Sequence, residues 1–244
     1  MDSKYSKRKN ELISKIVVAN LIKSYEDMAI AVHDLVQISP GLNEEEMNWL
    51  SVAYKHCVNT RIYSWHTVKK ALEQEKEANN TINVHKAEEM LKDIEVEIRT
   101  YCADILNMLE YKIIKNVADT TLKVSCFKLM GDHNHFLSEI ETNERRNYTI
   151  QQSHNAYEEG YNLATKTLDV DNPVFLALVL NYSLFLHETV KDAKRAMEIV
   201  MTARESIAEM SNVQTNNKST YILKLLDENM DRWGATENHY QELL

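Results

Sequence analysis

Apolar residues recur every three or four positions along most of the chain, and charged residues occupy the positions between them. Residues 94–109 carry the pattern clearly, with apolar side chains at Ile94, Ile98, Cys102, Ile105 and Leu109. At 3.6 residues per turn, this spacing places those side chains on one face of an amphipathic helix. The pattern therefore predicts an all-α protein of about nine helices, with long helices near residues 43–77 and 84–113.

Polar and turn-forming residues interrupt the helical pattern at five places, namely Ser39–Gly41, Asn79–Asn83, Gly131–Asn147, Asp169–Pro173 and Ser211–Ser219. Pro173 directly follows Asn172, an order typical of a helix that begins with a side-chain cap. No break has the composition of an interdomain linker. We therefore expect a single domain over residues 1–244, with short flexible ends near residues 1–8 and 235–244. No sequence repeat of fixed period indicates a helical solenoid.

Composition strengthens the all-helical prediction. The chain has only 4 Gly and 2 Pro in 244 residues, and these residues dominate the tight turns that short strands need. The 3 cysteines are odd in number and form no CxxC pair, so neither a disulfide framework nor a zinc site is indicated. His133 and His135 are two positions apart, and on a helix they point to different sides, so we expect no metal site there.

Charge and hydropathy limit the kinds of partner that we expect the protein to bind. The formal charge of -9 opposes binding to nucleic acid or to an anionic membrane. The longest apolar stretch, residues 174–180, is much shorter than the roughly 20 residues of a membrane-spanning helix. The N-terminal segment lacks the apolar core of a signal peptide. We expect a soluble, cytoplasmic protein. No nucleophile, acid–base group or phosphate loop stands out, so we expect neither an enzyme nor a cofactor.

Five ordered segments resemble one family. LSVAYKHCVNTRIYSW, FKLMGDHNHFLSEI and NPVFLALVLNYSLFLHE are similar to motifs of the third, fifth and seventh helices of 14-3-3 proteins. SYEDMAIAVHDLV and LLDENMDRW resemble the second and ninth helices, so the likeness extends from about Asn10 to Trp233. The resemblance implies a curved array of about nine antiparallel helices with a concave amphipathic groove. In the family, the groove holds an extended phosphoserine or phosphothreonine peptide.

The phosphate pocket that the resemblance implies is altered here. The family binds the phosphate with a lysine and an arginine on the third helix and an Arg-Tyr pair on the fifth. Lys55 matches the lysine, but Ile62 stands at the arginine position and His135-Phe136 replaces the pair. Lys128 matches a further basic groove residue. Each lost charge-assisted hydrogen bond is worth about 1.5–3 kcal/mol, so we expect weakened phosphate recognition.

Two questions about this pocket stay open at the level of sequence. Arg61 and Arg232 are basic residues near the altered motifs, and either one swinging inward would replace lost charge. A neutral His135 adds one donor and a protonated one adds a charge. Any surviving phosphate site should therefore tighten as the pH falls through about 6.5.

The rest of the implied groove matches the family better. Asn181 and Asn229 match its two clamps on the peptide main chain, and Glu188 and Trp233 also stand at family positions. The matching apolar wall comprises Leu180, Leu184, Ile222 and Leu225. Two simpler interpretations remain open: membership of the apolar residues in the core, and an internal hydrogen bond of Asn181 between helices.

The family pairs into two-fold dimers through its first four helices. The matching apolar positions are Val18, Ile22, Val68, Ala71 and Met90. The polar rim is changed, because Ser24 replaces an arginine opposite Glu97, and Asp27 stands opposite Asp93. Like charges at that place disfavour association. We expect a homodimer, with a heterodimer with a related protein as the alternative.

These observations favour an adaptor that binds phosphorylated or acidic segments of partner proteins through the groove. Lys55, Lys128 and His135 would contact the anion, and Asn181 and Asn229 would hold the main chain. The rival hypothesis is a phosphorylation-independent scaffold, or a heterodimer partner of typical 14-3-3 proteins. A helical scaffold outside the family is a third and weaker alternative.

Overall fold

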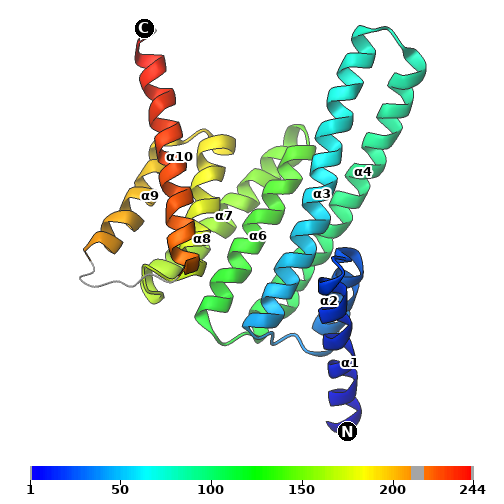
Figure 1. The fold of residues 1–244 in the computed structure, drawn as a ribbon, viewed down its shortest axis with the longest axis vertical. Helices are drawn as coiled ribbons and strands as arrows, with labels where there is room; N and C mark the ends of the chain where they lie inside the picture. Colours follow the sequence, from blue (N-terminus) through cyan, green and yellow to red (C-terminus); the bar gives the residue numbers. More distant parts are fainter. Residues whose placement is uncertain (1, 210–216, 243–244) are drawn as a thin grey trace. The chain divides into compact units, whose positions relative to one another are not determined.

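The computed structural model describes residues 2–209 and 217–242, and this part of the chain is helical and contains no strand (Figure 1). The first elements are α1 (Asp2–Leu21), α2 (Tyr25–Ile38), α3 (Glu44–Glu77), α4 (Thr81–Met108), η1 (Leu109–Ile113) and α5 (Ile114–Asn116). They are followed by α6 (Thr120–Ile140), α7 (Asn143–Thr167), α8 (Pro173–Phe185), η2 (Leu186–Val190), α9 (Ala193–Ala208) and α10 (Asn217–Glu242). The π-helical turns η1 and η2 continue α4 and α8, and the short α5 continues η1. Counted in this way, the described residues form nine helices, which confirms the predicted fold class.

Side-chain caps define several helix starts. Asn43 accepts a hydrogen bond from the backbone of Glu46, whose carboxylate accepts in turn from the backbone N–H of Asn43. This capping box satisfies two N–H groups that a helix start leaves unpaired. Asn172 accepts from the Val174 N–H, and Pro173 occupies the first turn of α8. The predicted helix starts near residues 43 and 173 are thereby confirmed.

One predicted break is present but much shorter than expected. Residues 131–147 read as polar and Gly-containing, yet α6 continues through Gly131 to Ile140, and α7 begins at Asn143. Only Glu141 and Thr142 separate the two helices. The predicted break at Ser211–Ser219 lies mostly outside the described residues. Of the ends that we expect to be flexible, residue 1 and residues 243–244 also lie outside them, while α1 and α10 include residues 2–8 and 235–242.

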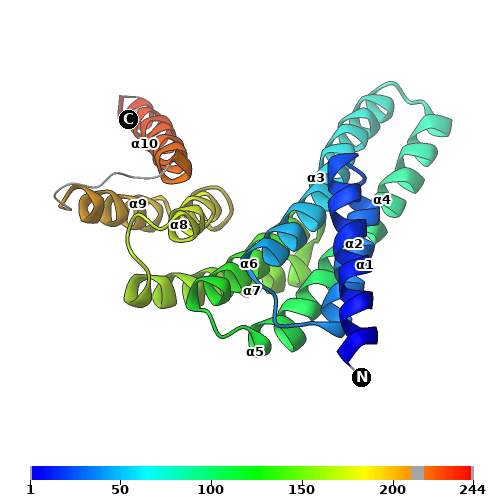
Figure 2. The same ribbon diagram turned by 60° about the horizontal axis from the view of Figure 1, so that its bottom comes forward.

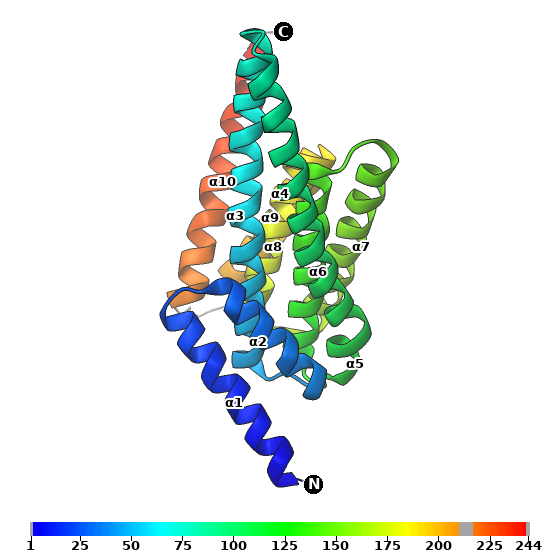
Figure 3. The same cartoon turned by 90° about the vertical axis from the view of Figure 1, so that its right-hand side faces the viewer.

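The chain divides into two compact units. Unit 1 comprises residues 1–118 and 136–149, and unit 2 comprises residues 119–135 and 150–244. In unit 1, α3 and α4 form a long antiparallel hairpin (Figure 2), and α2 packs against both α1 and α3. Figure 3 shows α1 and α2 as a neighbouring pair beside α3. An apolar cluster joins the hairpin to the end of α6, with buried Val58, Ile62, Trp65, Ile98, Cys102 and Ile140.

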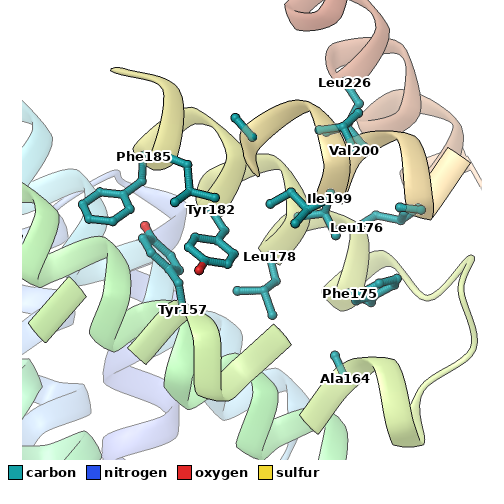
Figure 4. Close-up of a cluster of buried hydrophobic side chains, with 14 of the residues drawn as sticks. Tyr157, Ala164, Phe175, Leu176, Leu178, Tyr182, Phe185, Ile199, Val200 and Leu226 are labelled. Carbon is teal, nitrogen blue, oxygen red and sulfur yellow. The ribbon is translucent and has the colours of Figure 1, made fainter. Parts of the chain in front are cut away.

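Unit 2 is built around α8. Buried side chains of α7, α8, α9 and α10 form one apolar cluster, part of which Figure 4 shows. The ring of Tyr157 lies 5.5 Å from those of both Tyr182 and Phe185, measured between ring centroids. Aromatic pairs at this separation contribute packing energy beyond the area that they bury. This cluster fixes the places of α7 and α8, which carry several of the candidate site residues.

Hydropathy along α8 is higher than the sequence pattern indicated. By length and composition alone, Pro173–Val190 is the one stretch among the described helices apolar enough to cross a membrane, with a mean hydropathy of 1.4 over 18 residues. However, 44% of this stretch is buried inside the protein, and it supplies the centre of the unit 2 core. Core packing therefore explains its apolar composition.

Candidate functional site

A buried carboxylate organises the polar residues of unit 2. Asp132 on α6 is 6% exposed and contacts three donors from three helices. Its Oδ2 lies 2.7 Å from the Lys128 ammonium, one turn earlier on α6. Its Oδ1 accepts hydrogen bonds from the Tyr157 hydroxyl on α7 at 2.7 Å and from the Asn181 amide nitrogen on α8 at 2.8 Å. We call these four residues the Asp132 cluster.

The Asp132 cluster depends on a close crossing of α6 and α7. A Cβ atom added at Gly131 would lie 2.5 Å from two carbons of the Tyr157 ring, so a larger residue does not fit there. The Ser153 hydroxyl of α7 donates to the Gly131 carbonyl at 2.8 Å and ties the helices at the same level. Glycine thus lets the tyrosine ring approach closely enough for its hydroxyl to reach Asp132.

The charge of Asp132 is stabilised despite its burial. Burial alone would raise the pKa of this carboxyl, but the charge of Lys128 and the hydrogen bonds from Lys128, Tyr157 and Asn181 lower it below the ordinary aspartate value. Burial and the charge of Asp132 raise the pKa of Tyr157 well above its usual range. The carboxylate therefore stays ionised and the phenol stays neutral at physiological pH.

Asn181 is half-buried, and the internal hydrogen bond that its sequence context left open is present. An ionised carboxylate only accepts hydrogen bonds, so the NH₂ end of the amide must face Asp132. The second N–H of that amide and its Oδ1 are not used by this bond. The side chain thus combines an internal contact with remaining hydrogen-bonding capacity.

The second amide that we expect to hold the peptide main chain, Asn229, is more buried than Asn181. Asn229 on α10 is 7% exposed, yet its amide atoms are not among the described buried atoms that lack a partner. Trp233, one turn later, is 3% exposed and stacks on the His187 ring with centroids 4.5 Å apart. Glu188 is exposed. The predicted apolar wall residues are all half-buried, and three of them, Leu180, Leu184 and Ile222, pack against the unit 2 core.

His135 is half-buried at the end of the unit 2 part of α6. Its Nε2 lies 2.9 Å from the Thr189 hydroxyl, and its ring meets Phe185 edge-on with centroids 5.3 Å apart. The contact with Thr189 therefore uses Nε2, one of the two nitrogens of the His135 ring. An arginine at this position would present a fork of five N–H donors and a permanent charge, neither of which imidazole offers.

In unit 1, two of the predicted pocket positions belong to an apolar cluster. Ile62 is 9% exposed and packs with Val58, Trp65 and Ile98, and Phe136 packs against the same cluster. Lys55 is exposed and has no ion-pair partner among the residues that the structure describes. The positions 62 and 136 therefore present hydrocarbon where the family motif has donors to phosphate.

The ion pairs and the cation–π contact that Arg61 forms are with residues of unit 1. Its Nη1 lies 2.9 Å from Glu26 of α2, its Nε lies 2.8 Å from Glu97 of α4, and its guanidinium lies over the Tyr101 ring. The side chain is 19% exposed. Rotating Arg61 toward a bound anion would break two ion pairs and a cation–π contact, so this geometry does not support it as a substitute for the missing arginine.

The predicted dimer residues lie at the surface of unit 1. Val18, Ile22 and Met90 are 56%, 69% and 54% exposed. Ala71 is also exposed, and Val68 is half-buried. The rim is engaged within the chain: the Ser24 hydroxyl donates to Asp27 at 2.7 Å, and Glu97 is paired with Arg61. Apolar side chains are therefore exposed at four of these five positions, and the rim residues Asp27 and Glu97 already have partners within the chain.

The described part of the chain offers neither a metal-binding group nor an activated thiol. It contains no group of three or more His, Cys, Asp or Glu side chains placed to hold a metal ion. The cysteines are free and buried, and burial raises the pKa of Cys57 to about 11 and that of Cys126 to about 12. A thiol with such a raised pKa is a poor nucleophile near neutral pH.

Sequence reasoning missed Asp132 and Tyr157. Their partners are distant in the sequence, since Tyr157 follows Asp132 by 25 residues and Asn181 follows it by 49. One local signal was available: Lys128 and Asp132 are four residues apart, which favours an ion pair on one helix face.

Comparison with known proteins agrees with this picture. Residues 15–234 match the family described as 14-3-3 protein. The chain is 33% identical over 237 residues to 14-3-3 protein beta/alpha of Mus musculus, a match that covers 96% of this chain and 95% of the relative. The identity is also 33% over 237 residues to 14-3-3 protein beta/alpha-1 of Oncorhynchus mykiss, where 96% of each chain is covered. The chicken 14-3-3 protein beta/alpha (Gallus gallus) matches to the same extent.

Proposed function

Because the chain belongs to the 14-3-3 family, we propose that it is a non-catalytic adaptor that binds phosphorylated or acidic segments of partner proteins with weakened phosphate recognition. Family membership supports a phosphopeptide-binding adaptor role in general. The particular residues of this chain support the narrower statement about phosphate.

One observation carries the proposal. Ile62 is buried in the apolar cluster of unit 1, and Phe136 packs against that cluster. Two of the four positions that would bind phosphate thus supply carbon atoms only. A phosphate carries about -1.5 to -2 charges and is expensive to desolvate against hydrocarbon. The other two positions are Lys55, which is exposed, and His135, whose ring has one nitrogen next to Thr189.

The remaining residues support a hold on the ligand main chain and its apolar side chains. In this proposal Lys55, Lys128 and His135 contact the anion, and Asn181 and Asn229 bond to the peptide backbone. Leu180, Leu184, Ile222 and Leu225 form the apolar wall, with Glu188 and Trp233 beside them. The half-buried state of all four wall residues is compatible with a dual role in core and ligand binding.

The test compares a fluorescein-labelled peptide pool carrying a fixed central phosphoserine with the same pool carrying serine, by fluorescence anisotropy. We expect phosphorylation to strengthen binding about tenfold, which corresponds to one charge-assisted hydrogen bond of about 1.5 kcal/mol. Asn181→Leu should weaken both pools. Asn155→Leu is the matched control, because Asn155 is exposed on α7 and bonds only to Gln151 among the described residues. A failure of both pools to bind the native protein would refute the proposal.

The second candidate function is a phosphorylation-independent scaffold, which the burial of Ile62 also favours. Equal affinity for the phosphorylated and unmodified pools would select it. In either case we infer a cytoplasmic protein that pairs through Val18, Ile22, Val68, Ala71 and Met90, as a homodimer or with a related chain. Sedimentation equilibrium that shows only monomer, both alone and mixed with a typical relative, would refute the pairing.

A further inference from the structure

We propose that Asp132 is a positioning residue of the peptide site, which orients the Asn181 amide toward the ligand main chain and cancels the charge of Lys128. This inference rests on the proposed function, because it assumes that a peptide binds at Asn181. It adds a division of labour: the Asp132 cluster holds the amide that binds the ligand backbone, and the cluster contributes little net charge.

The orientation of Asn181 follows from the chemistry of its partner. An ionised carboxylate offers only acceptors, and a lowered pKa keeps Asp132 ionised. If the amide rotated by 180°, its oxygen would face the carboxylate oxygen now 2.8 Å from the nitrogen, and the two would repel. The NH₂ end therefore stays on Asp132. The Oδ1 atom is left to accept a hydrogen bond from a backbone N–H of the ligand.

The charge balance follows from the same carboxylate. The Lys128 ammonium is 2.7 Å from Asp132 Oδ2, and its side chain is 16% exposed. A lysine in such a pair contributes little net field at the site, since the opposite charge lies beside it. Lys128 therefore adds less to anion binding than its place in the sequence motif indicates.

The geometry also explains why these four residues act together. Tyr157 and Asn181 share Oδ1, while Lys128 occupies Oδ2, so the bonds use both carboxylate oxygens. Removing the negative charge of Asp132 breaks its ion pair with Lys128, whereas removing its acceptor oxygens breaks the hydrogen bond from Asn181. Two substitutions of Asp132 separate these effects: asparagine keeps an oxygen that can accept from Asn181, and leucine keeps only the approximate volume.

The experiment uses the tightest-binding member of the phosphoserine pool and its unphosphorylated form. A set of derivatives carries an N-methyl group at one peptide bond at a time, which removes single N–H donors. In the native protein, we expect methylation of one particular bond to weaken binding about tenfold, the value of a hydrogen bond of roughly 1.4 kcal/mol. In Asn181→Leu, that same methylation should cause no further loss, because the two changes remove one interaction.

The Asp132 variants then test positioning. Asp132→Leu should abolish the N-methyl effect, and Asp132→Asn should retain it. In both variants, the ratio of affinities for the phosphorylated and unmodified peptide should rise at least about threefold, because Lys128 is released from its partner. Ser153→Ala is the control: it removes a buried hydrogen bond to Gly131 from the same helix crossing and should change neither readout.

The outcomes separate the inference from the function on which it rests. A full N-methyl effect in a folded Asp132→Leu protein would overturn the positioning role, and an unchanged affinity ratio in Asp132→Asn would overturn the cancellation of the Lys128 charge. If Asp132→Leu does not fold, Asp132→Ala, which also removes the acceptor, takes its place in the N-methyl test. If Asn181→Leu itself leaves peptide affinity and the N-methyl effect intact, the proposed peptide site fails, whatever the Asp132 variants do.

Discussion

Restoring the phosphate donors should restore strong phosphate recognition. The perturbation is the triple change Ile62→Arg, His135→Arg and Phe136→Tyr, which returns the family residues to the three altered positions. Lys55 is already present and exposed. If the proposal is correct, the preference for phosphorylated over unmodified peptide should increase sharply, while affinity for the unmodified peptide should change little.

The size of the gain follows from the number of new donors. Two arginines that each make one charge-assisted bond, at about 1.5–3 kcal/mol per bond, add about 3–6 kcal/mol, or roughly a hundredfold to ten-thousandfold in affinity. The change also has a stability cost. Ile62 is 9% exposed, and burial of such a side chain contributes about 1.5–3 kcal/mol.

The arginine stem recovers part of that contribution, because its methylene groups can cover apolar surface. A net loss of about 1–2 kcal/mol corresponds to a fall in Tm of roughly 2–8 °C for a chain of this size. Thermal unfolding followed by circular dichroism at 222 nm measures the loss. Ile62→Gln is the matched control, since it should show a similar fall in Tm without any gain in phosphate preference.

The assay is titration of the serine and phosphoserine peptides by fluorescence anisotropy at two salt concentrations. The gain should shrink at high salt, because new charges near the surface are screened. A triple variant that remains folded, binds the unmodified peptide, and keeps the native phosphate preference would refute the assignment of positions 62, 135 and 136 to phosphate recognition.

Three further predictions concern the helices that build the site. Gly131→Ala should destabilise the protein by about 1–3 kcal/mol in urea unfolding, because its Cβ would lie 2.5 Å from the Tyr157 ring. Gly234→Ala is the control and should be neutral or slightly stabilising, because a Cβ there has no neighbour within 4 Å. Equal effects of the two substitutions would contradict the close crossing of α6 and α7. Asn43→Ala should lower the free energy of unfolding by about 1 kcal/mol through loss of the capping box, and an unchanged urea midpoint would argue against that cap. The pKa of Asp132 is lowered on folding, so its ionised form stabilises the native state above about pH 3.9, and this contribution is lost as the pH falls through the lower folded pKa. The stability advantage of the native protein over Asp132→Asn should accordingly shrink between pH 5 and pH 3 in urea titrations, and an advantage that persists unchanged at pH 3 would contradict the ion pair.

Local sequence signals located most helices but misjudged α6. The period of apolar residues and the Asn172-Pro173 cap signal are short-range features, and they predicted the starts of α3 and α8 correctly. The polar stretch from Gly131 predicts a break that begins too early, because glycine costs about 1 kcal/mol in a helix and polar residues favour loops. Tertiary contacts outweigh that cost here: Gly131 admits the Tyr157 ring, and Asp132 gains three partners.

The candidate site was predictable only where family motifs carry it. The motifs pointed to Lys55, Asn181 and the altered positions, but they did not reveal which side chains pair within the chain. Arg61 meets Glu26 and Glu97, which are 35 and 36 residues away, and Asp132 meets residues on two other helices. Such pairings depend on how helices pack, which no local period encodes. The sequence therefore left the role of Arg61 open, and the geometry assigns it to unit 1.

The altered pocket positions and the packing of unit 1 are connected. An arginine at position 62 would lie among Val58, Trp65 and Ile98, where an unpaired guanidinium is costly unless an anion or carboxylate accompanies it. Glu26 and Glu97 are paired with Arg61, the residue next to position 62 in the sequence. Isoleucine at position 62 and phenylalanine at position 136 remove that cost and extend the apolar cluster instead. We therefore expect variants that regain phosphate affinity through Ile62→Arg to depend more strongly on bound phosphopeptide for their thermal stability.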